Sequence, residues 1–200
     1  MIASVLRLSR ADCKASGIRD AYSIHKIVYS LFPKKDDATR DFLFADKGGD
    51  RDCRQILILS ERKPDLPVFG EIISKEIPDL FLKCDYYGFE VTVNPTQRKG
   101  VTHKIVPIRG MENLHEWFIG KAPSLGFEVE TQSLQVTRIG VQSFDKIKEG
   151  KTFKQTHGTA TFIGKLKVTD RQAFIKSFRQ GIGRAKGFGF GLLQIVPIKN

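Results

Sequence analysis

Apolar and polar residues alternate along this chain with two different periods. In residues 19–32 the apolar side chains recur at helical spacing and form one stripe, which Pro33 ends. Residues 111–121 and 170–180 show the same period, and Asp170 is suited to cap the latter helix. Alternation of period two predicts half-buried strands. We expect strands at residues 2–8, 55–59, 69–77, 87–93, 103–108, 127–130, 134–141, 160–168 and 192–197, while residues 40–44 are either a helical turn or a strand.

The order of these elements suggests two similar halves. Each half contains a strand, a helix, two strands, a helix or loop, and a final strand, which is the split βαβ plan of ferredoxin-like folds. The polar residues 94–100 carry a breaker at each end and separate the halves. We therefore expect an α+β fold of two tandem ferredoxin-like (RRM-like) domains, residues 1–99 and 100–200.

Positive charge is concentrated in the second half of the chain. The formal net charge is +11, of which residues 101–200 contribute +9, and from Lys146 onward twelve bases stand against two acids. Such clustering is typical of a face that binds a polyanion, most simply nucleic acid. Around Glu149 and Gly150 the pattern predicts a basic hairpin, residues 146–154, whose candidate RNA contacts are Lys146, Lys148, Lys151 and Lys154.

Five glycines and two cations follow the third predicted helix. The order helix, glycines, strand differs from the strand, glycines, helix order of nucleotide-binding loops, so a longer polyanion is the better ligand. An ordinary helix cap and turn would explain the glycines equally well. In this glycine-rich segment, residues 181–191, the candidate RNA contacts are Gly181, Gly183, Arg184, Lys186, Gly189 and Gly191.

The histidine with the most suggestive surroundings is His25. Tyr22 lies one helical turn before it and Lys26 beside it, whereas the other three histidines lack useful neighbours. Histidine titrates near neutral pH and can move a proton in a phosphodiester transesterification, and nearby cations can stabilise the charged phosphate. A helical histidine beside an apolar stripe can also be purely structural.

We expect neither a bound metal nor a cofactor. The three cysteines form no close pair, no histidine lies at ligand spacing, and no acidic cluster suggests a two-metal centre. The apolar runs are too short to span a membrane, and charge interrupts the N-terminus too early for a secretory signal. These features predict a soluble, cytoplasmic protein.

Several motifs occur together in a specific order. They are Tyr22-Ser23-Ile24-His25, Leu31-Phe32-Pro33, Arg40-Asp41-Phe42-Leu43-Phe44, Asn94-Pro95, Phe162-Ile163-Gly164 and the glycine-rich segment. In these motifs and in their order, the chain resembles the CasE (Cse-type) family of CRISPR repeat-processing endoribonucleases over nearly its whole length.

The resemblance implies tandem ferredoxin-like domains and a metal-independent reaction. Family members bind the stem-loop of a CRISPR repeat transcript and cut at the 3′ base of the stem, leaving 2′,3′-cyclic phosphate and 5′-hydroxyl ends. They then commonly stay on the guide RNA hairpin as a subunit of a Cascade-like complex. By the same resemblance the catalytic histidine is His25 and its tyrosine partner is Tyr22. Our own hypothesis from the distribution of charge is that the basic hairpin grips the stem, while the glycine-rich segment and the helix that carries Tyr22 and His25 converge on the scissile phosphate.

Two departures from the family pattern leave questions open. Some relatives carry a lysine five residues after the histidine, where this chain has Ser30, so the role of that lysine passes to Lys26, Lys34 or another cation, or is absent. Arg184 adds a charge that relatives need not have. Two rival functions are a non-catalytic subunit that binds the guide RNA hairpin and a general RNA-recognition module.

Overall fold

The computed structural model describes residues 1–33, 40–50, 52–98, 100, 104–148 and 151–198, without the side chains of residues 145–148 and 151–152. The described chain divides into two compact units. The first comprises Met1–Ile77, Ser143–Thr156 and Gly187–Gly189. The second comprises Pro78–Gln142, His157–Lys186 and Phe190–Asn200.

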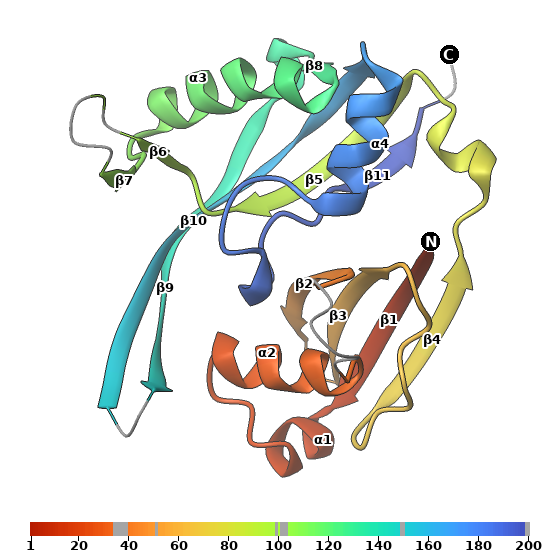
Figure 1. Ribbon diagram of the computed structural model, residues 1–200, viewed down its shortest axis with the longest axis vertical. Helices are drawn as coiled ribbons and strands as arrows, with labels where there is room; N and C mark the ends of the chain where they lie inside the picture. The colour runs from red at the N-terminus through yellow and green to blue at the C-terminus, as the bar shows by residue number, and fades with distance from the viewer. Residues whose placement is uncertain (34–39, 51, 99, 101–103, 149–150, 199–200) are drawn as a thin grey trace. The chain divides into compact units, whose positions relative to one another are not determined.

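The first unit is built on a four-stranded antiparallel sheet. Its strands are β1 (Ile2–Ser9), β2 (Phe42–Gly49), β3 (Cys53–Ser60) and β4 (Glu71–Glu76), in the order β2-β3-β1-β4 (Figure 1). The central strand β1 pairs along its whole length with β3. The sequence left open whether residues 40–44 form a helical turn or a strand. They lead into strand β2, which begins at Phe42.

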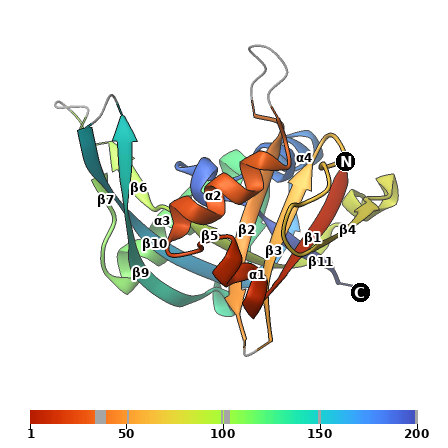
Figure 2. The same ribbon diagram turned by 90° about the horizontal axis from the view of Figure 1, so that it is seen from below.

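Helix α2 (Ala21–Ser30) covers one face of this sheet, and the short helix α1 (Arg10–Ala15) precedes it (Figure 2). The helix buries Ile24 and Val28 against apolar side chains that alternate along β1 and β3. These strand residues are Leu6, Leu8, Ile56 and Ile58. The buried stripe leaves the neighbouring edge of α2, which carries Tyr22 and His25, only half-buried.

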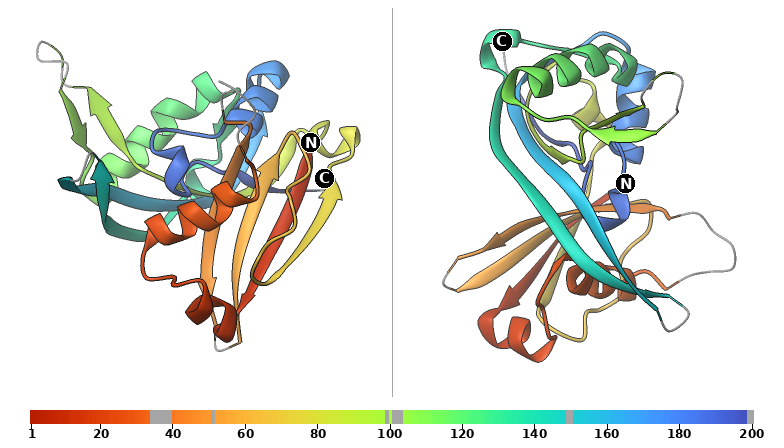
Figure 3. Two further views of the ribbon diagram at one scale, coloured as in Figure 1. Left: turned by 60° about the horizontal axis from the view of Figure 1, so that its bottom comes forward. Right: turned by 90° about the vertical axis from the view of Figure 1, so that its left-hand side faces the viewer.

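The second unit contains a sheet with strands β5 (Tyr86–Val93), β8 (Phe127–Val129), β10 (Lys151–Val168) and β11 (Gln194–Pro197), ordered β11-β5-β10-β8. Helices α3 (Met111–Lys121) and α4 (Arg171–Gln180) pack through Phe118 and Phe174 onto aromatic residues of this sheet. The strand β9 (Gln135–Lys148) pairs with β10, and the two form one long ribbon (Figure 3). The remaining elements are β6 (Thr96–Arg98), β7 (Ile105–Pro107) and the 3-10 helices η1 (Asp79–Leu82), η2 (Ala122–Leu125), η3 (Thr131–Ser133) and η4 (Lys186–Phe188).

Both sheets have the ferredoxin-like strand order, in which the first strand lies between the fourth and the third. The predicted α+β fold with tandem ferredoxin-like domains is confirmed. In the second unit both crossovers contain a helix, α3 and α4. In the first unit α1 and α2 form one crossover, and residues 61–70 connect β3 to β4 without a helix.

The boundary between the units does not follow the expected division at residues 99 and 100. Strand β5, expected as the last strand of the first domain, is the first strand of the second sheet and pairs with β10 and β11. Strand β4 already completes the first sheet by pairing with β1. Residues 105–107, expected to open the second domain, pair instead with β6. The alternation of apolar and polar residues identifies a strand, but it does not identify the neighbouring strand in the sheet. That neighbour is set by contacts with residues far away in the sequence.

Other local predictions are confirmed. Helix α4 begins after the cap Asp170, whose side chain accepts hydrogen bonds from two backbone N–H groups, and it ends at Gly181. None of the helices in the described ranges is both long and apolar enough to cross a membrane.

Candidate active site

Helix α2 presents the predicted catalytic pair. Its N-cap is Asp20, whose carboxylate accepts hydrogen bonds from the backbone N–H and the hydroxyl of Ser23, at 2.8 and 2.7 Å. The hydroxyl bond is the main reason that the pKa of Asp20 lies below its usual value. The cap fixes the start of the helix one turn before His25, and Tyr22 and Tyr29 then lie on the same edge as that histidine.

Two further aromatic rings contact the three on this edge of α2, and we call the five the ring cluster: Tyr22, His25, Tyr29, Phe144 and Phe188. The ring centroid of His25 lies 3.9 Å from that of Tyr29, 5.5 Å from that of Tyr22 and 5.2 Å from that of Phe188. Phe144 stacks on Tyr22 with centroids 5.9 Å apart and contacts Phe188 at 4.5 Å. All five belong to the first compact unit, and the rings of Tyr22, Tyr29 and Phe188 restrict rotation of the half-buried imidazole.

A backbone carbonyl fixes the tautomer of His25. The imidazole Nδ1 lies 2.7 Å from the carbonyl oxygen of Gly187. A carbonyl oxygen can only accept a hydrogen bond, so Nδ1 carries the proton. In the neutral ring the basic nitrogen is then Nε2. The arrangement can therefore supply an oriented imidazole that takes a proton through Nε2.

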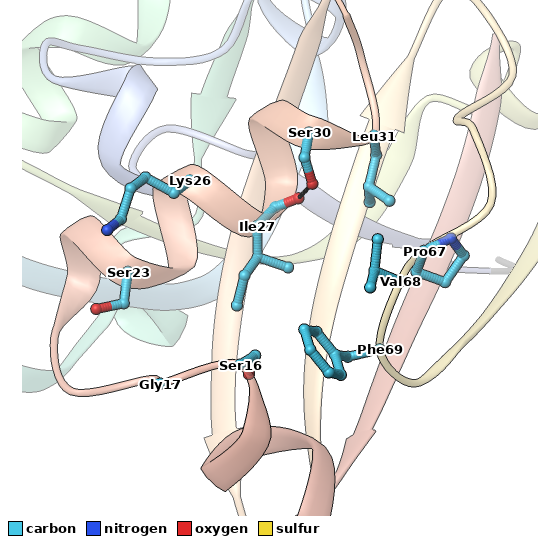
Figure 4. Close-up of a pocket in the computed structure, with 10 residues that line it drawn as sticks. All are labelled: Ser16, Gly17, Ser23, Lys26, Ile27, Ser30, Leu31, Pro67, Val68 and Phe69. Carbon is cyan, nitrogen blue, oxygen red and sulfur yellow. Dashed lines mark hydrogen bonds between the residues drawn. The ribbon is translucent and has the colours of Figure 1, made fainter.

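Of the two lysines predicted near His25, Lys26 and Lys34, the structure describes only Lys26. The Nζ atom of Lys26 lies 5.4 Å from the centroid of the Tyr22 ring, and the side chain is exposed. Lys34 lies outside the described residues. Lys26 and Ser30 both line a pocket of about 330 Å³ on the other side of α2, where Pro67 and Phe69 form part of the wall (Figure 4). The hydroxyl of Ser30 donates a hydrogen bond to the carbonyl of Ile27 at 2.8 Å, within the same helix.

The glycines at the two ends of the glycine-rich segment serve the fold. Gly181 is the buried C-cap of α4, and its N–H donates to the carbonyl of Ser177. Gly191 is also buried, its N–H donates to Thr92, and its carbonyl accepts from the N–H of Ile182. The N–H groups of Gly181 and Gly191 are thus both paired inside the second unit, where the two residues close the segment.

The middle of the segment is more accessible. Arg184 is exposed and forms an isolated antiparallel bridge with Asn94. Lys186 is half-buried, and its Nζ donates to the carbonyl of Gln180 at 2.7 Å. Positive φ angles occur at Gly183, at Gly189 and, without a glycine, at Ala185. Arg184 is thus the cation of this segment best placed to meet a ligand.

The basic hairpin is formed by the facing ends of β9 and β10. Lys154 is exposed on β10, beside the exposed Phe153. Lys146, Lys148 and Lys151 belong to the same strands, but their side chains lie outside the described part of the chain. The hairpin therefore offers at least one exposed cation and one exposed ring.

Comparison with known proteins now identifies the family. Residues 1–197 match the family model described as CRISPR associated protein. The chain belongs to this family of CRISPR-associated proteins. It is 26% identical over 204 residues to the CRISPR system Cascade subunit CasE of Escherichia coli strain K12, covering 96% of this chain and 99% of the relative.

Solved structures of CRISPR-associated proteins share the fold. A CRISPR endoribonuclease Cse3 bound to 19 nucleotides of RNA matches with a TM-score of 0.84 at 18% identity, covering 98% of this chain and all of that one. Cas6e of Escherichia coli K-12 matches with a TM-score of 0.73 at 24% identity, covering 99% of this chain and all of that one. The CasE-type resemblance predicted from the motifs is thus confirmed.

In this CRISPR-associated protein, sequence reasoning missed part of the site. Phe144 and Phe188 were not predicted to surround His25, and Arg40 was noted only as part of a motif. The local sequence does not distinguish Phe188 from Phe190, since both lie between two glycines, and only Phe190 is buried in the core. Among the described residues, no three His, Cys, Asp or Glu side chains lie together as a metal site would require.

Proposed function

We propose that this chain is an endoribonuclease that cleaves CRISPR precursor RNA at the 3′ base of the repeat stem-loop. The cut leaves 2′,3′-cyclic phosphate and 5′-hydroxyl ends without a metal ion, and the protein stays on the guide RNA hairpin in a Cascade-like complex. The observation that carries the proposal is the bond between His25 Nδ1 and the Gly187 carbonyl, because it leaves Nε2 as the base. The names of the relatives, a Cascade subunit and an RNA-bound endoribonuclease, supply the substrate class.

The reaction follows from these groups. Nε2 of His25 takes the proton of the 2′-hydroxyl at the scissile nucleotide, and the 2′-oxygen bonds to the adjacent phosphorus. The bond from phosphorus to the 5′-oxygen breaks, and that oxygen receives a proton to become the 5′-hydroxyl. Tyr22, stacked 5.5 Å from His25, orients a reacting group or gives this proton. Proton transfer by such groups accelerates reactions by about 10² to 10⁴.

Binding of the hairpin is assigned to the cations. Lys154 and Arg184 are exposed, and an A-form stem offers proteins mainly phosphates and 2′-hydroxyls. Lys26, Lys34, Lys146, Lys148, Lys151 and Lys186 remain candidate contacts, as does the backbone at Gly183 and Gly189. We propose that residues of both ferredoxin-like domains contact the RNA hairpin.

The test uses end-labelled repeat RNA and purified protein in EDTA. Cleavage by the wild type that disappears in His25→Ala, with hairpin affinity retained, would support the proposal. The matched control is His115→Ala, which changes a half-buried histidine on α3 in the other unit. Cleavage that survives His25→Ala, or that continues on RNA with a 2′-deoxy scissile nucleotide, would refute the mechanism.

Two rival functions give different results. A non-catalytic guide-RNA subunit would bind the hairpin and leave it intact in every variant. A general RNA-recognition module would bind unstructured RNA of equal length as tightly as the hairpin, whereas the proposal requires a strong preference for the hairpin.

A further inference from the structure

Arg40 is connected to the surroundings of His25 through two aromatic rings and through Gly187. It lies just before β2, its side chain is exposed, and its guanidinium carbon lies 6.0 Å from the centroid of the Phe42 ring. Phe42 in turn meets Tyr29 edge-to-face at 4.9 Å, and Tyr29 contacts His25 at 3.9 Å. Two successive ring contacts thus lead from the guanidinium to the imidazole, all within the first compact unit.

A second observation places the guanidinium independently. If Gly187 carried a Cβ atom, this atom would lie 3.1 Å from Nη1 of Arg40 and 3.2 Å from the Tyr29 hydroxyl. The carbonyl of the same glycine holds Nδ1 of His25. Arg40, Tyr29 and His25 therefore converge on one residue that has no side chain to stand between them.

The charge of Arg40 is not neutralised by the ion pairs found among the described residues. Those pairs join Arg54 to Asp46, Arg62 to Asp41, Lys165 to Glu130 and Arg171 to Asp85. A guanidinium stays protonated and presents a planar fork of N–H donors that matches two oxygens of a phosphate. Here the residue is exposed and its guanidinium carbon lies 6.0 Å from the centroid of the Phe42 ring.

We infer that Arg40 is a further catalytic residue, which contacts the scissile phosphate and stabilises its negative charge during cleavage. This inference rests on the proposed function and names a cation that stabilises the charge on the phosphate. Ser30, which replaces the lysine of some relatives, is bonded to Ile27 and carries no charge. Lys26 lies over Tyr22 and lines the pocket on the other side of α2, whereas Arg40 lies at the Gly187 side of His25.

Arg40 transfers no proton in this reaction. The 2′-oxygen bonds to phosphorus as its proton leaves, the bond to the 5′-oxygen breaks as that oxygen is protonated, and the two non-bridging oxygens carry the extra charge between these events. The N–H groups of Arg40 donate to those oxygens. Their contribution is largest when the charge is largest, so Arg40 affects the rate more than the affinity.

The experiment compares Arg40→Gln, Arg40→Lys and the control Arg10→Gln, which changes an exposed arginine on α1. Single-turnover cleavage with saturating protein and hairpin affinity are measured separately. We expect Arg40→Gln to lower the rate by about 100-fold, the usual effect of removing one such donor, and to change the dissociation constant by less than about 3-fold. Arg40→Lys should recover part of the rate because it restores the charge but not the fork.

Chemical rescue distinguishes a catalytic from a structural role. Guanidinium at tens of millimolar should raise the cleavage rate of Arg40→Ala several-fold over potassium chloride at equal ionic strength, and it should not rescue His25→Ala. The rescue measurement still tests the role of Arg40 if Arg40→Gln unfolds, because the cleavage rate with guanidinium is measured only on folded Arg40→Ala or Arg40→Lys protein.

The outcomes separate the two proposals. A wild-type protein that does not cleave would overturn both. A wild-type protein that cleaves through His25, with Arg40→Gln at the wild-type rate or with Lys26→Gln alone showing the 100-fold loss, would overturn the role of Arg40 and leave the proposed function standing. Loss of affinity without loss of rate at saturation would also overturn it.

Discussion

The imidazole Nδ1 of His25 lies 2.7 Å from the carbonyl oxygen of Gly187, two residues that are 162 positions apart in the chain. Because the carbonyl can only accept, we expect the neutral His25 ring to be the Nδ1-protonated tautomer. Long-range proton–nitrogen NMR of the full chain measures this directly. His115, which lies on α3, serves as an internal reference for the assignment. A neutral ring protonated at Nε2 would contradict the proposed base.

The hydroxyl of Tyr22 is expected to act in the chemistry and its ring in positioning. We expect Tyr22→Phe to lower the single-turnover rate by about 100-fold, because it removes one proton donor and keeps the stack on His25. Tyr22→Ala should cost more, since the contacts with His25 and Phe144 are lost as well. Tyr86→Phe, on β5, is the matched control. A wild-type rate for Tyr22→Phe would remove the hydroxyl from the mechanism.

Gly191 and Gly183 should respond very differently to the same substitution. Both have positive φ, but a Cβ at Gly191 would lie 2.3 Å from the backbone oxygen of Ile182, whereas one at Gly183 would lie 3.9 Å from Val93. We expect Gly191→Ala to lower the free energy of unfolding by about 3 kcal/mol and Gly183→Ala by about 1 kcal/mol. Urea unfolding, followed by the fluorescence of Trp117, measures both. Equal losses would show that the clash is relieved by movement of the backbone.

Stability of the second unit should fall in mild acid because of His157. Burial lowers the pKa of His157, and its Nδ1 lies 3.2 Å from the side-chain nitrogen of Asn94, an amide that donates to the neutral ring. Between the lowered pKa and the usual 6.5, the unfolded chain binds more protons than the folded one. The stabilisation is therefore complete above about pH 6.5 and is lost as the pH falls below it.

Urea unfolding between about pH 5 and pH 7.5 tests this dependence. His157→Gln should flatten the pH profile in that window, and His115→Gln is the matched control variant. A profile that keeps its slope in His157→Gln would assign the acid sensitivity to another group.

Lys154 should contribute to RNA affinity through its charge alone. It is exposed on the basic hairpin, so Lys154→Gln should weaken hairpin binding and reduce the slope of log affinity against log salt by about 1. The single-turnover rate at saturation should stay unchanged. Lys14→Gln, on the exposed helix α1, is the control. An unchanged slope would place the stem elsewhere on the protein.

The sequence was most informative where the signals are local. The cap Asp170, the terminator Gly181 and the apolar stripe of α2 each act within a few residues, and all appear where the pattern predicted them. The strand at residues 87–93 was also predicted, but its membership of the second sheet was not. Its partners are β10 and β11, which lie far along the chain, and a two-residue period contains no information about them.

In the candidate site, too, local relationships were predictable from the sequence and long-range contacts were not. His25 and Tyr22 are neighbours on one helix edge, so spacing alone could relate them. Phe144, Phe188 and Arg40 reach the same place from other elements, and only the folded chain shows that they contact this edge or its glycine. From the sequence we expected the glycine-rich segment and the catalytic helix to converge on the scissile phosphate, but not that a carbonyl of that segment would form a hydrogen bond with His25.

The partner of His25 is a group that every amino acid possesses. Replacing Gly187 changes what surrounds the carbonyl but cannot delete it, so a scan of single substitutions cannot remove this hydrogen bond at its acceptor. What places the oxygen is the path of the backbone at Gly187–Gly189, which belongs to the first unit together with His25. Insertion or deletion of one residue in this segment is therefore the genetic change that would separate the carbonyl from the imidazole. Among natural relatives, we expect the length of this segment to be more tightly constrained than the identity of its residues.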